Sequence, residues 1–206
     1  INAMRVLDPT FTPVQEIHNL RLGRVIADAD PQINQTLDRF LDCTGLAIRP
    51  VEMPGLNDAF DAGMRIINAE TFAACGHLLA TGKVGDDVAQ RLSRAQDTSE
   101  EELMLAEEVR AQFTQAVDRA LSDVTALVLP TLPSFPMTLA DAEAGKIDLQ
   151  ISALARPFNL SGHPALSIPL ETEDRRPVGL QLVGRKGDDE LLCELARIMS
   201  AFISQS

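Results

Sequence analysis

Three short apolar runs in the last third of the chain are each bounded by proline or glycine. They are Ala126–Leu129, Ala165–Ile168 and Val178–Val183. A strand covered on both faces of a sheet is continuously apolar instead of alternating, and proline or glycine at its ends leaves the ladder intact. The pattern therefore predicts three buried strands in this part of the chain.

Two further strands are predicted around a helix near the start of the chain. Leu20–Ile26 alternates well enough for a strand, and Leu46–Met53 is a second candidate. Between them, Asp30 and Pro31 are residue types that begin helices, and Gly45 is well placed to end one. Five strands in alternation with about six helices predict an α/β layered domain with a mixed sheet.

Helical spacing of apolar residues covers most of the middle of the chain. Thr98 and Glu101 have the spacing of a capping box, which predicts a long helix from Ser99 to about Ser122. The other helices are expected over Leu56–Ala80, Val88–Ala95, Thr138–Ala144 and from Asp188 to Phe202, and Leu149–Phe158 is ambiguous.

The first residues differ from the rest of the chain. They contain two prolines and little periodicity, so residues 1–19 are expected to form an arm ahead of a domain over residues 20–206. Ile1-Asn2-Ala3 before Met4 has the look of a cloning scar.

Composition and charge narrow the classes of function. The chain has 206 residues, and 45% of them are hydrophobic, which suits one domain with a real core. A formal net charge of −12 disfavours a nucleic-acid surface and an anionic membrane as partners. No apolar run approaches the roughly 20 residues of a membrane span. Cys43, Cys75 and Cys193 lie far apart, as expected for reduced thiols in a cytoplasmic protein.

Two motifs in the last third carry a family resemblance. Asn159–Ala165, Asn-Leu-Ser-Gly-His-Pro-Ala, and Pro177–Gly184, Pro-Val-Gly-Leu-Gln-Leu-Val-Gly, resemble the C-terminal part of amidase-signature enzymes. These are serine amidohydrolases that cleave carboxamides. The resemblance extends more loosely back to about Leu20, and it covers the second half of a typical member. It implies part of an α/β/α layered fold whose mixed sheet is covered by helices.

The catalytic set of that family is not visible in the sequence. Amidase-signature enzymes are understood to use a Ser-Ser-Lys relay, in which the lysine acts as a base once its pKa is lowered. The chain has no Ser-Ser pair, and Lys83, Lys146 and Lys186 lack an apolar context. The resemblance implies that all three catalytic positions lie outside this chain. We therefore expect no catalytic residue here.

The same reasoning sets the expected cofactors and partners. No cofactor and no metal is expected, because the histidines and cysteines lack ligand spacing. The expected partner is the missing N-terminal catalytic half or a second copy of the chain, since a part-sheet leaves an edge or a face uncovered. A small carboxamide would be the substrate of the completed enzyme.

Two segments are candidates for the wall of a substrate pocket. Loop 130–136 has three prolines in seven residues and follows a strand end, where open α/β sheets bind ligands. In the resembled family, the Asn159–Pro164 segment lies beside the substrate cleft, although its residues also suit a purely structural turn. The candidate wall residues are Pro130, Thr131, Ser152, Asn159, Ser161, Gly162 and His163.

Two of these candidates bear on chemistry. Ser152 lies seven positions before Asn159, where amidases that select a glutamine side chain tend to have an acidic residue, so glutamine-amide specificity is disfavoured. Ser161 and His163 bring a hydroxyl and an imidazole close together, but the sequence identifies no carboxylate to orient the ring. A structural turn around Gly162 is favoured over a catalytic pair.

The leading hypothesis is the C-terminal half of an amide hydrolase that supplies sheet, helices and pocket walls. The alternative is a non-catalytic relic or interaction subunit that docks on an amidase or self-associates. An independent α/β enzyme is disfavoured, because the sequence shows no convergent set of titratable groups.

Overall fold

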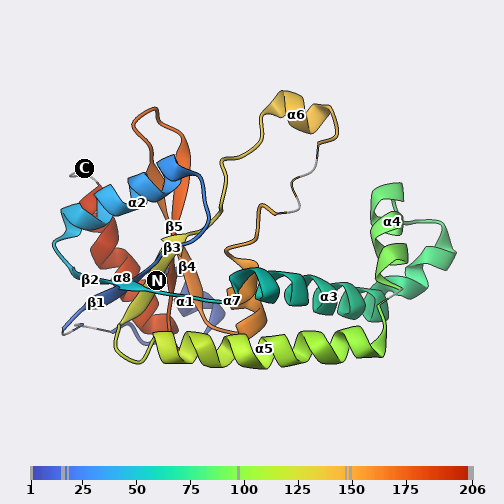
Figure 1. Cartoon of the computed structure of the whole chain (residues 1–206), viewed down its shortest axis with the longest axis horizontal. Helices are drawn as coiled ribbons and strands as arrows, with labels where there is room; N and C mark the ends of the chain where they lie inside the picture. The colour runs from blue at the N-terminus through green and yellow to red at the C-terminus, as the bar shows by residue number, and fades with distance from the viewer. Residues whose placement is uncertain are drawn as a thin grey trace.

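The computed structural model describes residues 2–14, 17, 19–96, 98–146, 148 and 150–203. Some expectations involve positions outside that range: Ile1 of the predicted scar, residues 15, 16 and 18 of the predicted arm, and Leu149 of the ambiguous segment. Within the described residues, the chain forms one mixed sheet with helices on both faces (Figure 1).

The five strands stand in the order β2-β1-β3-β5-β4. β1 (Arg21–Val25) pairs in parallel with β2 (Ala47–Val51) and with β3 (Ala126–Pro130). β5 (Pro177–Val183) runs antiparallel to β3 and to β4 (Ala165–Glu171). The carboxyl ends of β1, β2 and β3 therefore lie at one end of the sheet, together with the amino end of β5.

The helix α2 (Pro31–Thr44) joins the parallel strands β1 and β2, and its sequence explains both of its ends. The carboxylate of Asp30 accepts a hydrogen bond from the Gln32 N–H at 2.8 Å, and Gly45 has a φ of 64°, which glycine adopts at no steric cost. The other helices are α1 (Asn2–Leu7), α3 (Leu56–Cys75), the 3-10 helix η1 (Gly76–Thr81), α4 (Asp86–Ala95), α5 (Glu100–Ala120), α6 (Leu139–Glu143), α7 (Arg156–Ser161) and α8 (Asp189–Ile203).

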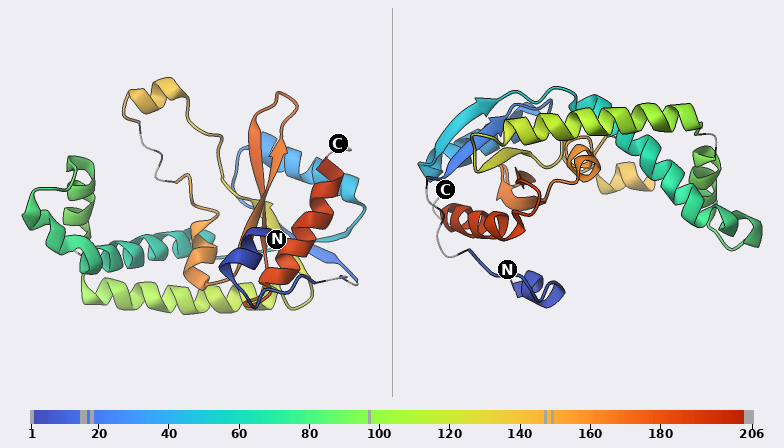
Figure 2. Two further views of the ribbon diagram at one scale, coloured as in Figure 1. Left: turned by 180° about the vertical axis from the view of Figure 1, so that it is seen from behind. Right: turned by 90° about the horizontal axis from the view of Figure 1, so that it is seen from below.

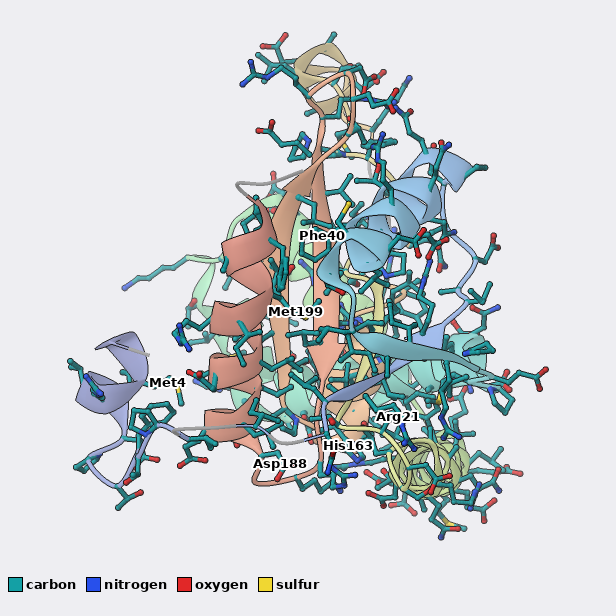
Figure 3. The ribbon with its side chains drawn as sticks, turned by 90° about the vertical axis from the view of Figure 1, so that its left-hand side faces the viewer. Met4, Arg21, Phe40, His163, Asp188 and Met199 are labelled. Carbon is teal, nitrogen blue, oxygen red and sulfur yellow. The ribbon has the colours of Figure 1, made fainter. Side chains whose placement is uncertain are left out.

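The sheet separates two hydrophobic cores. Leu127 of β3 packs in the core under α3, α5 and α7, whereas its neighbour Val128 packs in the core under α2 and α8. Figure 2 shows the sheet between α5 on one side and α8 on the other, and Figure 3 shows Phe40 of α2 and Met199 of α8 on the same side of the sheet. This three-layer arrangement confirms the predicted α/β/α class with a mixed sheet covered by helices.

The edge strand β4 differs from its prediction. It was expected to be buried on both faces, but burial alternates along it: Ile168 and Leu170 are buried, while Ser167 and Pro169 are exposed. The reason is that α3, α5 and α7 cover their face of the sheet only as far as β5. One face of β4 therefore lies open in this chain.

The backbone of β4 is also open along its outer edge. Gly184 N–H donates to the Pro164 carbonyl at one end of the ladder, and Thr172 N–H donates to the Arg176 carbonyl at the other. Because antiparallel partners alternate, the even-numbered residues of β4 bond to β5 and the odd-numbered ones direct their backbone groups outward. Pro169 is one of the outward residues, and it has no N–H to offer.

Three local predictions also need correction. The expected arm contains the helix α1 among its described residues. The capping box of α5 is formed by Ser99 and Glu102, one position after the predicted pair, because both pairs have the same spacing. The strand β3 extends to Pro130, which was assigned to the following loop.

The long helices α3 and α5 run side by side away from the sheet and carry α4 at their far end (Figure 1).

Candidate functional site

A cavity of about 720 Å³ lies where the parallel strands β1, β2 and β3 end. Its walls come from the loops after these strands, from the start of α3 and from the segment ahead of α7. Carboxylates accept hydrogen bonds but do not donate them, so the three aspartates of the wall favour a ligand group that carries N–H donors. The lining residues are Asp28, Met53, Gly55, Leu56, Asn57, Asp58, Phe60, Asp61, Pro133, Gln150, Ala153 and Leu154.

Two contacts with other parts of the chain hold the proline-rich loop that follows β3. The Asp30 N–H donates to the carbonyl of Pro133 at 2.8 Å, which ties the loop to the start of α2. The guanidinium of Arg176, from the β4–β5 hairpin, lies over the ring of Phe135 at 3.7 Å from its centroid. Together with the fixed φ of its prolines, these contacts make the loop a stiff wall between two cavities.

The second cavity lies between this loop and the β4–β5 hairpin, and it measures about 290 Å³. Beside it, the hydroxyl oxygens of Thr131 and Ser167 lie 2.6 Å apart. Gly179 makes this contact feasible, because a Cβ there would lie 2.5 Å from Thr131 Oγ1 and 2.8 Å from Ser167 Oγ. The lining residues are Ile33, Leu132, Ser134, Pro136, Ser167, Pro169, Pro177, Val178 and Gly179.

A chain of hydrogen bonds connects three residues at the opposite end of the sheet. His163 Nδ1 lies 2.9 Å from Ser161 Oγ, and His163 Nε2 lies 3.1 Å from Asp118 Oδ1. Burial lowers the pKa of His163, opposed by its hydrogen bond to Asp118, so the ring is neutral at pH 7. A carboxylate can only accept, hence Nε2 carries the proton and Nδ1 is an acceptor. Nδ1 therefore competes with the Phe158 carbonyl, which lies 3.2 Å from Ser161 Oγ, for the one proton of the Ser161 hydroxyl.

The order hydroxyl, imidazole, carboxylate is that of serine hydrolases, but this group is not accessible to a substrate. Ser161 is 3% exposed, and the His163 side chain is 0% exposed. A nucleophile must meet the carbonyl carbon that it attacks, and here protein atoms occupy that space. The network instead joins the end of α7 to α5, which agrees with the turn expected around Gly162, whose φ is 71°.

The remaining predicted residues lie along α7 and just ahead of it. Ser152 Oγ accepts a hydrogen bond from Arg156 Nη2 at 3.3 Å. Asn159 is exposed and lines a cavity of about 170 Å³ between α3, α5 and α7. Arg110, from α5, also lines this cavity and donates from Nε to the Leu160 carbonyl at 3.0 Å.

The predicted wall residues therefore do not meet in one place. Thr131 follows the carboxyl end of β3, whereas His163 precedes β4 at the opposite end of the sheet, the end at which Arg21 begins β1 (Figure 3). Pro130 is buried within β3. Sequence reasoning missed Asp118, because no local pattern links a helix residue to a histidine 45 positions later. It also missed Ser167 and Gly179, which meet Thr131 only through strand pairing.

The described residues hold no group of three or more His, Cys, Asp or Glu side chains placed to bind a metal ion. The helices of the described part include none long and apolar enough to cross a membrane.

Comparison with known proteins places the chain in a family. The family model described as Amidase matches residues 17–193. This chain belongs to the amidase family. The match extends through all five strands and their covering helices, from ahead of β1 into α8.

Curated relatives are similar over less than half of this amidase chain. A glutamyl-tRNA(Gln) amidotransferase subunit from Halobacterium salinarum is 35% identical over 92 residues, which are 44% of this chain and 22% of that protein. The corresponding amidotransferase subunit from Haloarcula marismortui is 41% identical over 81 residues, 38% of this chain and 19% of that protein.

Solved structures extend the similarity over nearly the whole amidase chain. A crystal structure of an amidase has a TM-score of 0.85 and 23% identity, covering 97% of this chain and 49% of that one. Kluyveromyces lactis allophanate hydrolase has a TM-score of 0.78 and 21% identity, covering 93% of this chain and 34% of that one. The chain thus spans about half the length of the solved amidase.

Proposed function

We propose that this chain is the C-terminal portion of an amide hydrolase, and that it acts on a carboxamide only together with a Ser-Ser-Lys set from another polypeptide segment. In this proposal, residues 20–206 supply sheet, helical layers and pocket walls, residues 1–19 form an arm, and the assembled enzyme works in the cytoplasm. The observation that carries it is the fold match to 49% of a solved amidase, with the open face and edge of β4 left over.

The surroundings of the three lysines support the proposal that the catalytic set comes from another polypeptide segment. A lysine becomes a general base when burial or neighbouring cations lower its pKa. Lys83 and Lys186 are exposed, and the exposed Lys146 pairs with Asp141 at 2.6 Å. With no Ser-Ser pair in the sequence either, we expect no amide hydrolysis by the Ser-Ser-Lys route from this chain alone.

The geometry at the strand ends supports the proposed pocket walls. The aspartate-lined cavity and the stiff loop after β3 face the end of the sheet where open α/β folds bind ligands. Thr131, in that loop, is the predicted wall residue with the best claim to contact a substrate. Ser152 already bonds Arg156 and offers no carboxylate for a glutamine amide, so we propose a small carboxamide other than glutamine.

Native mass and ammonia release together test this function. The native species would be isolated from its source and offered a panel of aliphatic and aromatic carboxamides, beside the purified chain alone. We expect ammonia from a native species of about twice this mass and blank-level release from the chain alone. Replacing the serines and lysine of the proposed set in the native species serves as the control and should abolish release.

Two results would overturn the proposal. Ammonia release by the purified chain alone would show that its own residues catalyse hydrolysis. A native species with the mass of this chain and no ammonia release would favour the rival, an interaction subunit that docks on an amidase or on itself.

A further inference from the structure

An open apolar groove runs between α3 and α5 where these helices extend away from the sheet (Figure 1). It measures about 750 Å³ and lies between the second half of α3 and the part of α5 that faces it. Ile66 in this groove is buried, Leu103 is half-buried and Met104 is 66% exposed. The lining residues are Ile66, Ala69, Glu70, Ala73, Leu103, Met104, Glu107, Glu108 and Ala111.

Apolar side chains beside the groove are exposed as well. Ile67 is 44% exposed and Leu105 is 51% exposed. Contiguous exposed apolar surface of this kind marks a binding site. Two helices that lie side by side leave a groove that a third helix can fill, and Ala69, Ala73 and Ala111 leave room for its backbone to approach.

Nearer the sheet, the chain places a helix of its own between α3 and α5. The helix α7 packs against both of them, and its Phe158 is fully buried. Its Arg156 guanidinium lies 5.8 Å from the centroid of the Phe60 ring of α3, and the Arg156 Nε is buried. The cavity beside α7 and the outer groove share Ile66 and Glu70, so they adjoin. The outer groove is lined by α3 and α5 alone, and a helix is the occupant that its inner neighbour favours.

The charge of the groove restricts the kind of helix. In the two segments that form it, residues 66–73 and 103–111, the charged residues are Glu70, Glu107, Glu108 and Arg110. Arg110 pairs with Glu107 at 3.3 Å and also donates from Nε to the Leu160 carbonyl. Three negative charges and one positive charge leave two negative charges around an apolar floor. This surface complements an apolar helix face with basic flanks, whereas the same surface of a second copy would set like charges together.

We propose that this groove binds a basic amphipathic helix of a separate protein. Apolar side chains of that helix, spaced at i, i+3, i+4 and i+7, would lie against Ile66, Leu103 and Met104. Its lysines or arginines would lie beside Glu70 and Glu108. The groove is distinct from the open face and edge of β4, which belong to the sheet. The proposal does not rest on amide hydrolysis, because α3 and α5 of this chain form the whole groove.

Fluorescence anisotropy with three labelled peptides tests this binding on the full chain at constant ionic strength. The first peptide is a helix of about 14 residues, or about 21 Å, with leucine at the spacing above and lysine on both flanks. The second carries glutamate in place of each lysine, and the third has the composition of the first in a scrambled order. We expect the first peptide to bind about tenfold or more tightly than either of the others. The scrambled peptide separates groove binding from attraction between net charges.

Matched variants locate the binding. Ala111→Arg places a bulky cation in the groove and should weaken binding of the lysine peptide about tenfold or more. Gln112→Arg makes the same charge change on the next exposed residue, which does not line the groove, and should have little effect. Glu108→Gln should weaken binding about threefold, whereas Glu101→Gln, outside the groove, should not. The glutamate pair keeps the test decisive if Ala111→Arg fails to fold.

Two other occupants would give different results. A dimer of the chain that Ala111→Arg dissociates, observed by analytical ultracentrifugation, would assign the groove to a second copy. Lysine-peptide binding by the chain alone but not by the native species would assign it to the rest of the enzyme. Either result would overturn the proposal, as would equal affinity for the three peptides or unchanged binding by Ala111→Arg and Glu108→Gln. Failure of amide hydrolysis in the native species would leave the expected peptide binding unaffected.

Discussion

The Nε2 atom of His163 lies 3.1 Å from Oδ1 of Asp118, and this contact ties the turn ahead of β4 to the last third of α5. His163 also bonds Ser161, so one buried imidazole joins three elements. We expect His163→Ala to lower the free energy of unfolding by about 3 kcal/mol, through a cavity and two lost hydrogen bonds. Urea denaturation measures the change.

The matched variant for this network is Asp118→Asn. The Asp118 side chain is 58% exposed, and asparagine keeps an oxygen acceptor in place, so the expected loss is only about 0.5 kcal/mol. Equal effects of the two substitutions would contradict the view that the buried ring is the centre of the network.

The same histidine should make stability depend on pH. Burial sets the pKa of His163 below the 6.5 of an unfolded chain, so the unfolded state takes up a proton first as the pH falls. The contribution of the neutral His163 ring to the free energy of unfolding is therefore fully present above about pH 6.5. It is lost as the pH falls through the pKa that His163 has in the folded state. Lys186 also disfavours the protonated ring, whereas Asp118 favours it.

Urea midpoints at pH 7.5, 6.5 and 5.5 test this dependence. His163→Gln should flatten the fall in stability between these values, because it removes the titrating ring and retains hydrogen-bonding groups. His77→Gln is the control, since the exposed side chain of His77 makes no hydrogen bond or ion pair with the other described residues. An equal fall in the His163→Gln variant would assign the effect to other groups.

Gly179→Ala should disturb the wall between the two strand-end cavities. The added Cβ would lie 2.5 Å from Thr131 Oγ1, so the loop or the hydroxyl pair must shift. Overpacking of this kind costs about 1–3 kcal/mol, and thermal unfolding would detect it. Gly85→Ala is the control, because Gly85 has a φ of −61° and its new Cβ would meet only the Asp87 carboxylate oxygen at 3.2 Å.

The register of the capping box can be tested by two alanine substitutions. Ser99→Ala should cost about 1 kcal/mol, because Ser99 Oγ accepts from the Glu102 N–H at 3.2 Å and the Glu102 carboxylate accepts from the Ser99 N–H. Thr98→Ala should be nearly neutral. The reverse order in urea denaturation would support the register that the sequence suggested first.

Local chemistry explains why much of the fold could be predicted. Asp30, Pro31 and Gly45 act on their own neighbours, so the ends of α2 follow from residue types. The apolar runs of β3 and β5 likewise follow from burial, because helices cover these strands on both faces. The predicted position of the capping box was wrong by one residue, because two Ser/Thr-x-x-Glu pairs overlap in the sequence.

The candidate site is formed by contacts between residues far apart in the sequence, which no local pattern predicts. Thr131 meets Ser167 because β3, β5 and β4 pair in a particular register, and His163 meets Asp118 because α5 packs against the sheet. The buried Nε of Arg156 is a property of three packed helices. For β4, an apolar run with proline at both ends correctly predicted a strand. The prediction that both faces of this strand are buried was wrong, because the sequence does not indicate which elements cover it.

The outward residues of β4 determine how copies of this chain can associate. An incoming strand would find full backbone hydrogen-bonding groups at Ala165, Ser167 and Glu171, but only a carbonyl at Pro169. Indefinite stacking of identical edges, as in amyloid, requires an unbroken row of donors and acceptors. Pro169 thus interrupts the row of donors along the outer edge of β4, which disfavours continuous stacking of identical edges.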